Sequence, residues 1–563
     1  MAKAEYYVPD ERPWFKFYPE GVPHHLDYPE VPLYQFLDDS AEKYPERPAL
    51  IFYGKKISYR ELKELSDKFA RALQEFGIQK GDRIFLLLPN CPQFVIAFYG
   101  AMKIGAVPIP FNPLYSAEEL KYFFHDAEPR IVLSLDTFYD KVQEAAKVTP
   151  QIEKIIVTSI ADYFPSFQRA MGKLFKKIPS PQCPNAVSFL DFIKESEPKY
   201  NPVQINPKED IVVIIYTGGT TGEPKGVMLT HFNILSNMTA VDCILNTEKI
   251  KISVWLTSVP FFHIYGIGPA LQWGIMRQAT IILLPKFNSK EAIGLIRKYK
   301  VDYFPGIPAM YSAFLNYYEK NKKEPILNSV NIASSGSSSF PASVIEKIKE
   351  ILPNAFLMEV FGATETSPGI TMDVPGKNYK KKNNTVGIPF LDTDVKIINY
   401  QTKEELPYGE VGEIIVRGPQ IFKGYWRKPE KTKEVLRDGW FYTKDIGRID
   451  NDGLLYIEGR IDDMINVRGE KVWPREVEEV LEQNPKVRDV AVIGVTDDYY
   501  GQAIKACVVL KEGEMATEEE MIEFCREKLA PYKVPHLIEF FEELPKSNLG
   551  KTLHYKLRER EQK

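Results

Sequence analysis

Cysteine is scarce in this chain of 563 residues, and its five cysteines are widely scattered. No two of them form a Cys-x-x-Cys pair, and their number is odd. This arrangement argues against a structural zinc site and a disulfide framework, and it favours a reducing compartment. The cysteines are Cys91, Cys183, Cys243, Cys507 and Cys525.

Long apolar runs are also missing. No uninterrupted apolar stretch reaches the roughly 18 residues that a membrane-spanning helix needs. The first residues, Met-Ala-Lys-Ala-Glu-Tyr-Tyr, lack the apolar core of a signal peptide. We therefore expect a cytoplasmic protein without a spanning helix.

An excess of positive charge is absent as well, since the net charge is −4. No global basic field therefore indicates nucleic acid as a partner. Apolar residues make up 44% and charged residues 26% of the chain, which is ordinary for a globular protein. At this length one hydrophobic core is not expected, so the chain should contain several domains or subdomains.

Strand and helix patterns alternate through about the first 300 residues. Apolar residues recur at helical spacing over 62–76, and a glycine stands directly after them where a C-cap belongs. Residues 84–88 are wholly apolar, as in a strand buried on both faces, and a helix is expected from Pro92 to just before Gly105. Residues 211–215 form another strand of this kind. Repeated strand–helix units predict parallel sheets covered by helices, with ligands beyond the carboxyl ends of the strands.

The pattern changes twice further along the chain. Beyond about residue 385 glycines become dense and strand-like segments lie between turns, which indicates a small β-rich subdomain. Residues 474–529 then show the helix, strand, strand and helix of a compact α+β domain. The predicted fold class is α/β. A large N-terminal domain (1–459) holds two doubly wound αβα subdomains and a small β-barrel-like subdomain, and a small α+β C-terminal domain (460–563) follows.

A glycine-rich segment follows the apolar strand at 211–215. Residues 216–226 read Tyr-Thr-Gly-Gly-Thr-Thr-Gly-Glu-Pro-Lys-Gly, and we expect a helix after them that Thr230 caps. Backbone N–H groups, threonine hydroxyls and the mobile charge of Lys225 suit a phosphate group. Because Glu-Pro follows the third glycine, this is not a Walker P-loop. The predicted nucleotide-binding residues of the loop are Thr217, Gly218, Gly219, Thr220, Thr221, Gly222 and Lys225.

The segment 217–226 resembles the signature (S/T)SG(S/T)TGxPKG of the adenylate-forming superfamily, with glycine replacing one serine. This superfamily comprises acyl-CoA synthetases, firefly luciferases and peptide-synthetase adenylation domains. Further segments that resemble it run in order from about Ile57 to Lys551. The chain is most similar to a medium- or long-chain fatty acyl-CoA synthetase, which implies a carboxylic acid, ATP and CoA as substrates and Mg²⁺ as cofactor.

Residues 361–365, Phe-Gly-Ala-Thr-Glu, resemble the aromatic-Gly-x-Thr-Glu motif of the family. The resemblance implies that the aromatic ring packs on adenine and that the threonine holds a phosphate oxygen. Glu365 and Thr217 would bind Mg²⁺, a hard cation that prefers carboxylate and phosphate oxygens. The implied nucleotide-binding residues here are Phe361, Gly362, Ala363 and Thr364.

Residues 442–445, Tyr-Thr-Lys-Asp, resemble the motif Tyr-x-Thr-Gly-Asp, with Lys444 in place of glycine. The resemblance implies that Asp445 accepts hydrogen bonds from the ribose hydroxyls. Arg460 would contact the ribose or a phosphate. Asp462 falls at the hinge between the two domains, where some members carry lysine.

Residues 545–551, Pro-Lys-Ser-Asn-Leu-Gly-Lys, resemble the C-terminal motif Pro-x-Thr-x-x-Gly-Lys. Lys551 is then the adenylation lysine, a mobile cation that offsets the negative charge building on the α-phosphate and the leaving pyrophosphate. The implied catalytic residues are Lys551, Glu365 and Thr217. Residues 467–473 resemble the face that meets the CoA thiol, and the implied CoA-binding residues are Arg468, Gly469 and Glu470.

Residues 260–266 resemble the segment that lines the acyl pocket. His263 is predicted to contact the substrate carboxylate or to gate the acyl channel, and a satisfied core histidine is an equal alternative. Ile267 and Gly336 are the other predicted acyl-binding residues. Gly336, within the small-residue run 334–339, is also placed beside the nucleotide.

Residues 162–179 combine apolar side chains at helical spacing with basic ones. This pattern favours a membrane surface or a lipid entrance, and it resembles an insertion in fatty acyl-CoA synthetases. An ordinary helix packed on the domain is an equal alternative.

We expect a monomer or a homodimer.

The residues and the resemblance together predict an ATP-dependent acid–thiol ligase. A fatty acid would be activated as acyl-AMP with release of pyrophosphate, and the acyl group would pass to CoA. Two alternatives remain open, namely an aryl-CoA ligase of the 4-coumarate or benzoate type and an adenylate-former with a carrier-protein acceptor. The candidate site residues argue against a non-catalytic nucleotide-binding relative.

Overall fold

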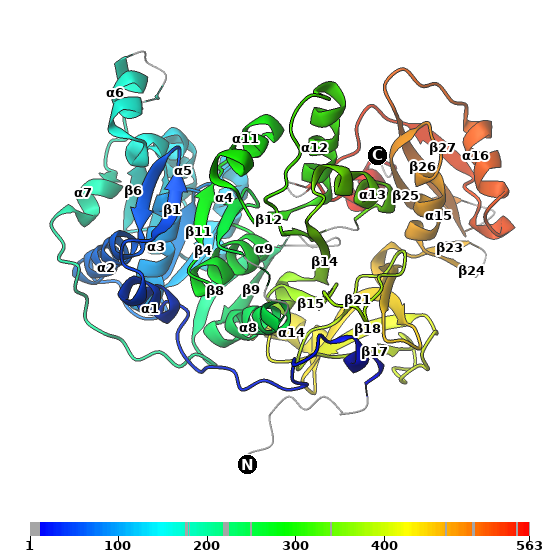
Figure 1. The fold of residues 1–563 in the computed structure, drawn as a ribbon, viewed down its shortest axis with the longest axis horizontal. Coiled ribbons are helices and arrows are strands. Elements are labelled where there is room, and N and C mark those ends of the chain that lie inside the picture. The colour runs from blue at the N-terminus through cyan, green and yellow to red at the C-terminus, as the bar shows by residue number, and fades with distance from the viewer. Residues whose placement is uncertain are drawn as a thin grey trace.

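The computed structural model describes residues 12–174, 178–179, 181–217, 224–247, 250, 252–337, 340–467, 470–497, 501–547 and 550–561. Most of the chain forms one broad body, and the elements nearest the C-terminus form a separate group on one side of it (Figure 1). No helix in these described ranges is long and apolar enough to cross a membrane.

One sheet of this body is wholly parallel, with strand order β4-β3-β5-β6-β7. Helices α2 (Tyr59–Glu75) and α3 (Pro92–Lys103) pack against each other in the same half. Residues 84–87 of β3 are fully buried, as the apolar run predicted. Gly77 takes a left-handed φ of 93° just past the end of α2, which confirms the predicted C-terminal stop. The strands are β3 (Arg83–Leu87), β4 (Val107–Pro110), β5 (Ile131–Leu135), β6 (Lys154–Thr158) and β7 (Val187–Ser188).

A second sheet has nine strands in the order β16-β15-β14-β13-β12-β10-β11-β1-β2. The pairs from β14 to β1 are parallel, whereas β2, β15 and β16 are added antiparallel at the two edges. Helix α11 (Ser289–Tyr299) contacts β10 and α12 (Pro308–Lys320). The bounds are β1 (Pro48–Phe52), β2 (Lys55–Ser58), β10 (Val254–Thr257), β11 (Thr280–Leu283), β12 (Tyr303–Gly306), β13 (Ile332–Ser335), β14 (Phe356–Gly362), β15 (Gly369–Met372) and β16 (Ile388–Pro389).

A strand that the sequence pattern did not reveal separates the glycine-rich loop from the predicted helix. Strand β8 (Ile211–Thr217) pairs antiparallel with β9 (Lys225–Thr230), and β19 (Gly424–Tyr425) extends this pair. The alternating side chains of 225–230 account for the strand, because Val227 and Leu229 point into the core and are fully buried. Helix α8 (His231–Thr247) begins only after β9. Thr230 Oγ1 accepts a hydrogen bond from Asn233 N–H at 3.1 Å, which confirms Thr230 as its cap.

The predicted β-rich subdomain is an antiparallel sheet of five strands. Its order is β17-β18-β21-β20, and β22 pairs with the free side of β21. The chain leaves this sheet through β22 and enters the last part of the structure (Figure 1). The bounds are β17 (Asp394–Ile398), β18 (Gly412–Arg417), β20 (Leu436–Arg437), β21 (Trp440–Ile449) and β22 (Leu455–Arg460).

The last part of the chain has hydrophobic cores of its own. Two clusters of buried residues there draw all their members from between Ile465 and Leu557. The sheet order is β24-β23-β26-β25, with β27 parallel to β26. A domain boundary at 460–463 stays a prediction. The bounds are β23 (Ile465–Val467), β24 (Glu470–Val472), α15 (Pro474–Glu482), β25 (Val487–Asp497), β26 (Gly501–Leu510), α16 (Glu518–Arg526), β27 (Leu537–Phe540) and α17 (His554–Glu561).

Helix α6 (Ser166–Leu174) projects from the edge of the body, far from the C-terminal elements (Figure 1). Phe164, just before it, packs on Tyr53 with ring centres 4.6 Å apart and ring planes tilted by 52°. Phe167 is 75% exposed and Met171 is 36% exposed. Two apolar side chains of this helix are therefore exposed to solvent. Residues 175–177, at the end of the predicted basic amphipathic segment, lie outside the described residues.

Candidate active site

The base of the glycine-rich loop lies beside an aromatic ring. Thr217 and Lys225 are register partners at the loop end of the β8–β9 pair, and both are partly buried. Lys225 Nζ lies 5.1 Å from the centre of the Tyr425 ring. Burial, and then the nearby Lys444, lower the pKa of Lys225, so an added negative charge is favoured at this point. The loop residues Gly218, Gly219, Thr220, Thr221 and Gly222 lie outside the described residues.

Glu365 lies in a single 3-10 turn directly after β14 and contacts the same tyrosine. Its Oε1 accepts a hydrogen bond from Tyr425 Oη at 2.8 Å. Burial raises the pKa of Glu365, while Arg460 and Lys225 act in the opposite direction. Tyr425 thus connects the hairpin that carries Thr217 with the turn that carries Glu365.

The oxygen donors of this region fit Mg²⁺. A carboxylate and a hydroxyl are hard ligands, and Mg²⁺ is commonly held by one or two carboxylates together with substrate phosphates. Within the described ranges, no group of three or more His, Cys, Asp or Glu side chains could hold a metal ion. Glu365 and Thr217 would therefore need phosphate oxygens to complete the coordination.

The end of β14 is held by a close backbone approach. A Cβ on Gly362 would lie 1.8 Å from the carbonyl oxygen of Pro368, so only glycine fits at this position. Thr366 Oγ1 donates to the same carbonyl at 2.7 Å and accepts a hydrogen bond from Ala363 N–H at 2.9 Å. Phe361, directly before, is partly buried opposite Thr371. The backbone of residues 361–364 is therefore held in place directly before Glu365.

Asp445 and Arg460 are direct partners across the β21–β22 pair. Arg460 Nε lies 3.5 Å from Asp445 Oδ1. Burial raises the pKa of Asp445, although Arg460 opposes the shift. The charge of Asp445 raises the pKa of Arg460, to which Glu365 also contributes. Strand β22 thus places Arg460 beside Asp445 and close enough to Glu365 for their charges to interact.

Lys551 reaches this group from the far end of the chain. Its backbone N–H donates to Ser547 Oγ at 3.1 Å, and a Cβ on the preceding Gly550 would lie 3.5 Å from Ala309 in α12. Lys551 is exposed, although neighbouring protein atoms partly desolvate its ammonium group. Desolvation, and then the positive charge of Arg460, lower its pKa, while Asp445 acts in the opposite direction.

The predicted hinge residue also has a charged partner. Asp462, in the 3-10 turn Ile461–Asp463, lies with Oδ2 3.4 Å from Lys444 Nζ. Its neighbour Asp463 pairs with Arg558 of α17 at 2.8 Å. The turn between β22 and β23 is therefore tied to both parts of the chain.

His263 stands immediately before the short helix α9 (Ile264–Ile267). Among the described residues its buried Nε2 atom has no hydrogen-bond partner, and burial lowers the pKa of the imidazole to about 4. A neutral histidine with an unused ring nitrogen differs from the satisfied core histidine that was the alternative. A π-helical turn, Gly268–Gln272, continues from Ile267, which is fully buried.

Gly336 lies at the end of β13, close to the aromatic ring of Tyr265. A Cβ there would meet Val360 O at 3.4 Å and the ring at 3.7 Å, which are ordinary van der Waals contacts rather than clashes. The preceding Ser334 is fixed by the hydroxyls of Tyr265 and Tyr303, at 2.9 and 2.8 Å. Residues 338–339 of the small-residue run lie outside the described residues.

The predicted CoA-binding residues are only partly described. Glu470 is exposed at the start of β24, opposite Val467. Arg468 and Gly469 lie outside the described residues. The structure thus brings together Lys225, Glu365, Asp445, Arg460 and Lys551, whereas Glu470 lies on a separate hairpin.

Two family models match this chain. Residues 37–426 match the family described as AMP-binding enzyme, and residues 476–551 match the AMP-binding enzyme C-terminal domain. The chain belongs to the AMP-binding enzyme family. It is 40% identical to the long-chain-fatty-acid–CoA ligase of Bacillus subtilis (strain 168), over 98% of each chain.

Solved structures of the family share the fold. ATP-bound MatB from Rhodopseudomonas palustris superposes with a TM-score of 0.81 at 28% identity, covering 94% of this chain and 99% of that chain. Apo MatB from the same organism, with the same identity and coverage, superposes with a TM-score of 0.72. Among these two states, the arrangement of this chain is closer to the ATP-bound one.

Sequence reasoning overlooked Tyr425, which contacts both Lys225 and Glu365 in this AMP-binding enzyme. Its signal was the aromatic pair Tyr425-Trp426 after Gly424, in a stretch with no other apparent role. Gly424 has a φ of 143°, and the short strand β19 carries Tyr425 against the glycine-rich hairpin. Only this pairing, which joins segments far apart in the sequence, shows that the tyrosine belongs to the site.

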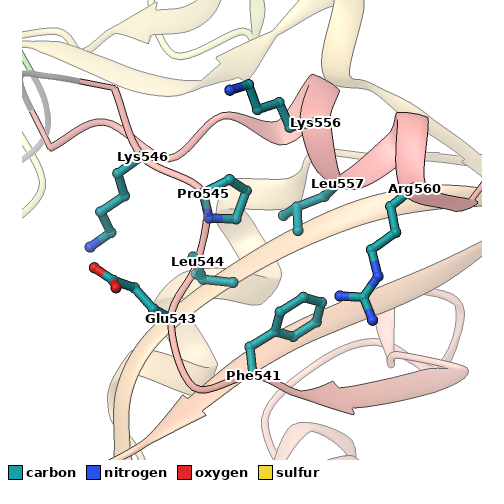
Figure 2. Close-up of a pocket in the computed structure, with 8 residues that line it drawn as sticks. All are labelled: Phe541, Glu543, Leu544, Pro545, Lys546, Lys556, Leu557 and Arg560. Atoms are coloured by element: carbon teal, nitrogen blue, oxygen red, sulfur yellow. The ribbon is translucent and has the colours of Figure 1, made fainter. Parts of the chain in front are cut away.

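An open groove of about 550 Å³ lies elsewhere, in the C-terminal part (Figure 2). Its floor is apolar, with Leu544 and Leu557, and Arg560 projects beside Phe541 at one end. None of the candidate site residues lines it. The groove therefore adds no residue to the candidate active site.

Proposed function

We propose that this chain is an AMP-forming fatty acid–CoA ligase with a preference for long-chain acids. The main support is that charged residues from five separate segments converge in one group, namely Lys225, Glu365, Asp445, Arg460 and Lys551. Such a group suits a nucleotide whose ribose, phosphates and leaving pyrophosphate each need a partner. Membership of the AMP-binding enzyme family and the 40% identity to a long-chain ligase support the same assignment.

In the first half-reaction the substrate carboxylate attacks the α-phosphorus of ATP and pyrophosphate leaves, which gives acyl-AMP. Asp445 accepts hydrogen bonds from the ribose hydroxyls, and Arg460 contacts the ribose or the α-phosphate. Lys551, Lys225 and the 217–225 loop stabilise the negative charge that grows on the phosphates. Glu365 and Thr217 hold Mg²⁺, which supplies further charge neutralisation when bound.

In the second half-reaction the CoA thiolate attacks the acyl carbonyl and AMP leaves. The C-terminal domain (460–563) rotates about Asp462, withdraws Lys551 and presents Arg468, Gly469 and Glu470 to CoA. The higher TM-score with the ATP-bound state than with the apo state supports the view that the present arrangement serves adenylation.

The acyl group lies near His263, Ile267 and Gly336. The unused Nε2 of the neutral His263 is suited to a substrate oxygen, since a buried polar atom without a partner is costly. Gly336 lies next to the Tyr265 ring. The exposed Phe167 and Met171 of α6 contact a lipid surface from which the substrate enters, with the basic side chains of 162–179 on anionic headgroups.

The test is an ATP–pyrophosphate exchange screen over acids from hexanoate to stearate, with 4-coumarate and benzoate included. We expect exchange to rise towards the long-chain acids and to be weak with the aromatic ones. A maximum at an aromatic acid would establish the aryl-CoA alternative. A flat response to every acid, with CoA thioester absent, would contradict the proposal.

A further inference from the structure

Lys444 occupies a position that the backbone makes unfavourable for it. Its φ is 63°, in the left-handed region that glycine adopts readily and side chains with a Cβ avoid. The cause is an irregularity in β21, because the pairing with β18 shifts between Glu413 and Ile415. This explains why the motif that residues 442–445 resemble carries glycine here, and it raises the question of what the lysine contributes.

The Lys444 ammonium lies against the predicted hinge. Nζ is 3.4 Å from Asp462 Oδ2 and 3.5 Å from Oδ1, so both carboxylate oxygens face it. The side chains are 45% and 21% exposed. Lys444 belongs to the sheet of the N-terminal part, whereas Asp462 lies in the turn after β22 that leads to the C-terminal part. The ion pair therefore joins the N-terminal sheet to the turn about which the C-terminal part would rotate.

Other charges around this pair connect it to the nucleotide group. Lys225 of β9 and Glu434 of α14 (Pro429–Val435) both feel the charge of Lys444. Arg460 in turn feels the charge of Asp462. The pair thus lies close to the charged residues that surround Lys551 in this structure.

We propose that the Lys444–Asp462 ion pair holds the C-terminal domain in the adenylate-forming orientation, which makes Lys444 a positioning residue. This inference rests on the proposed function, since it presumes rotation about Asp462. When the pair is formed, the turn 461–463 is fixed to β21 and Lys551 stays beside Asp445 and Arg460. Rotation towards the thioester-forming orientation requires the pair to separate.

The expected effect is moderate, because the pair is exposed to solvent. Ion pairs of this exposure shift an equilibrium by about two- to fivefold, and salt screens them. The measured quantity is the ratio of two rates, ATP–pyrophosphate exchange and thioester formation from supplied acyl-AMP. A general loss of folding or substrate binding lowers both rates, whereas a shift in orientation changes their ratio.

Four variants test the pair. Lys444→Met removes the charge and keeps the length, and it should lower the ratio by about two- to fivefold at low salt and by less at high salt. Lys444→Arg keeps the charge and should leave the ratio unchanged. Asp462→Lys places two cations together and should lower the ratio further. The exchanged pair K444E/D462K should restore much of it. An unchanged ratio in Lys444→Met, or a ratio in the exchanged pair no higher than in Asp462→Lys, would overturn the proposal.

A second measurement needs no catalysis. Spin labels at Val148→Cys and Met515→Cys, both exposed, report the distance between the two parts of the chain. Cys183 and Cys243 are replaced by serine in this background, because they are the two cysteines that are not fully buried. Lys444→Met should shift or broaden the distance distribution of the substrate-free protein. If the wild type forms no acyl-AMP, the proposed function fails. In that case an unaltered distance distribution in Lys444→Met still decides against the ion pair.

Discussion

Asp445 faces Arg460 directly across the β21–β22 pair, with Oδ1 3.5 Å from Nε. Both side chains are largely withdrawn from solvent, at 14% and 31% exposure. Each partner favours the ionised form of the other, while burial acts against the charge of Asp445. The two residues thus form a charged edge to which ribose and phosphate can be added.

Asp445→Asn should raise the KM for ATP by about 10- to 100-fold, because hydrogen bonds to a charged group contribute about 1.5–3 kcal/mol. The measurement is the ATP dependence of pyrophosphate exchange. Asp452→Asn is the control, since its carboxylate pairs with Lys16 and Lys382 away from the site. An unaltered KM in Asp445→Asn would remove this residue from the ATP site.

Tyr425→Phe should raise the Mg²⁺ concentration for half-maximal exchange by about two- to tenfold, because Glu365 loses the hydroxyl that orients it. Glu365→Gln should lower the exchange rate itself by about 10²-fold. Titration of Mg²⁺ at fixed ATP separates the two effects. Tyr53→Phe, at an exposed site, is the control. Equal Mg²⁺ curves for all variants would exclude Glu365 as a metal ligand.

Lys551→Ala should lower ATP–pyrophosphate exchange by about 10²- to 10³-fold while sparing thioester formation from supplied acyl-AMP. The reason is that the lysine acts on charge that develops only in the first step. Lys546→Ala, in the same loop and paired with Asp489, is the matched control. Equal losses in both half-reactions would refute the alternation of orientations.

The stability of the C-terminal part should fall as the pH rises above about neutrality. His554 Nε2 lies 2.8 Å from Glu478 Oε1, and this partner raises the pKa of His554 above its usual 6.5 despite the cost of burial. The protonated pair therefore contributes stability fully below about pH 6.5 and loses it as the pH passes through the raised pKa. Thermal unfolding of wild type and His554→Gln between pH 6 and 9 measures the difference, with His24→Gln as control. A constant difference across this range would contradict the pairing.

The double variant F167S/M171S should reduce co-sedimentation with vesicles of anionic phospholipid by several-fold, since it removes apolar surface from α6. Leu114→Ser, at another site that is 74% exposed, is the control. Exchange activity with a water-soluble acid should be unchanged in both. Equal sedimentation of wild type and double variant would favour the alternative in which this helix has no membrane role.

The sequence predicted elements wherever local periodicity and burial agree. Residues 84–87 and the end of α2 at Gly77 are examples, because apolar runs and a left-handed glycine act locally. The strand at 225–230 was not predicted because its strand character depends on pairing with β8 and β19, and the second of these partners lies far along the chain.

The same distinction between local signals and long-range contacts applies to the candidate site. The motifs named Glu365, Asp445, Arg460 and Lys551, but no motif could show that Tyr425 joins two of the segments. The Lys444–Asp462 contact was equally hidden, since it arises from a register shift in β21 that no local pattern marks. Departures from a motif, such as lysine in place of glycine, show where such contacts are to be sought.

The π-helical turn Gly268–Gln272 has a consequence for the way the acid specificity of such a chain can diverge. A π-turn holds one residue more than an α-turn, so loss of a single residue here would leave a regular helix. The π-turn absorbs the extra residue, so the segments on either side would keep nearly the same relative rotation. His263 and Ile267 would stay in place, and only the side chains of the turn itself would shift. Deletion or insertion of one residue here is therefore a way to change the lining beside the proposed acyl site without moving the flanking sheets.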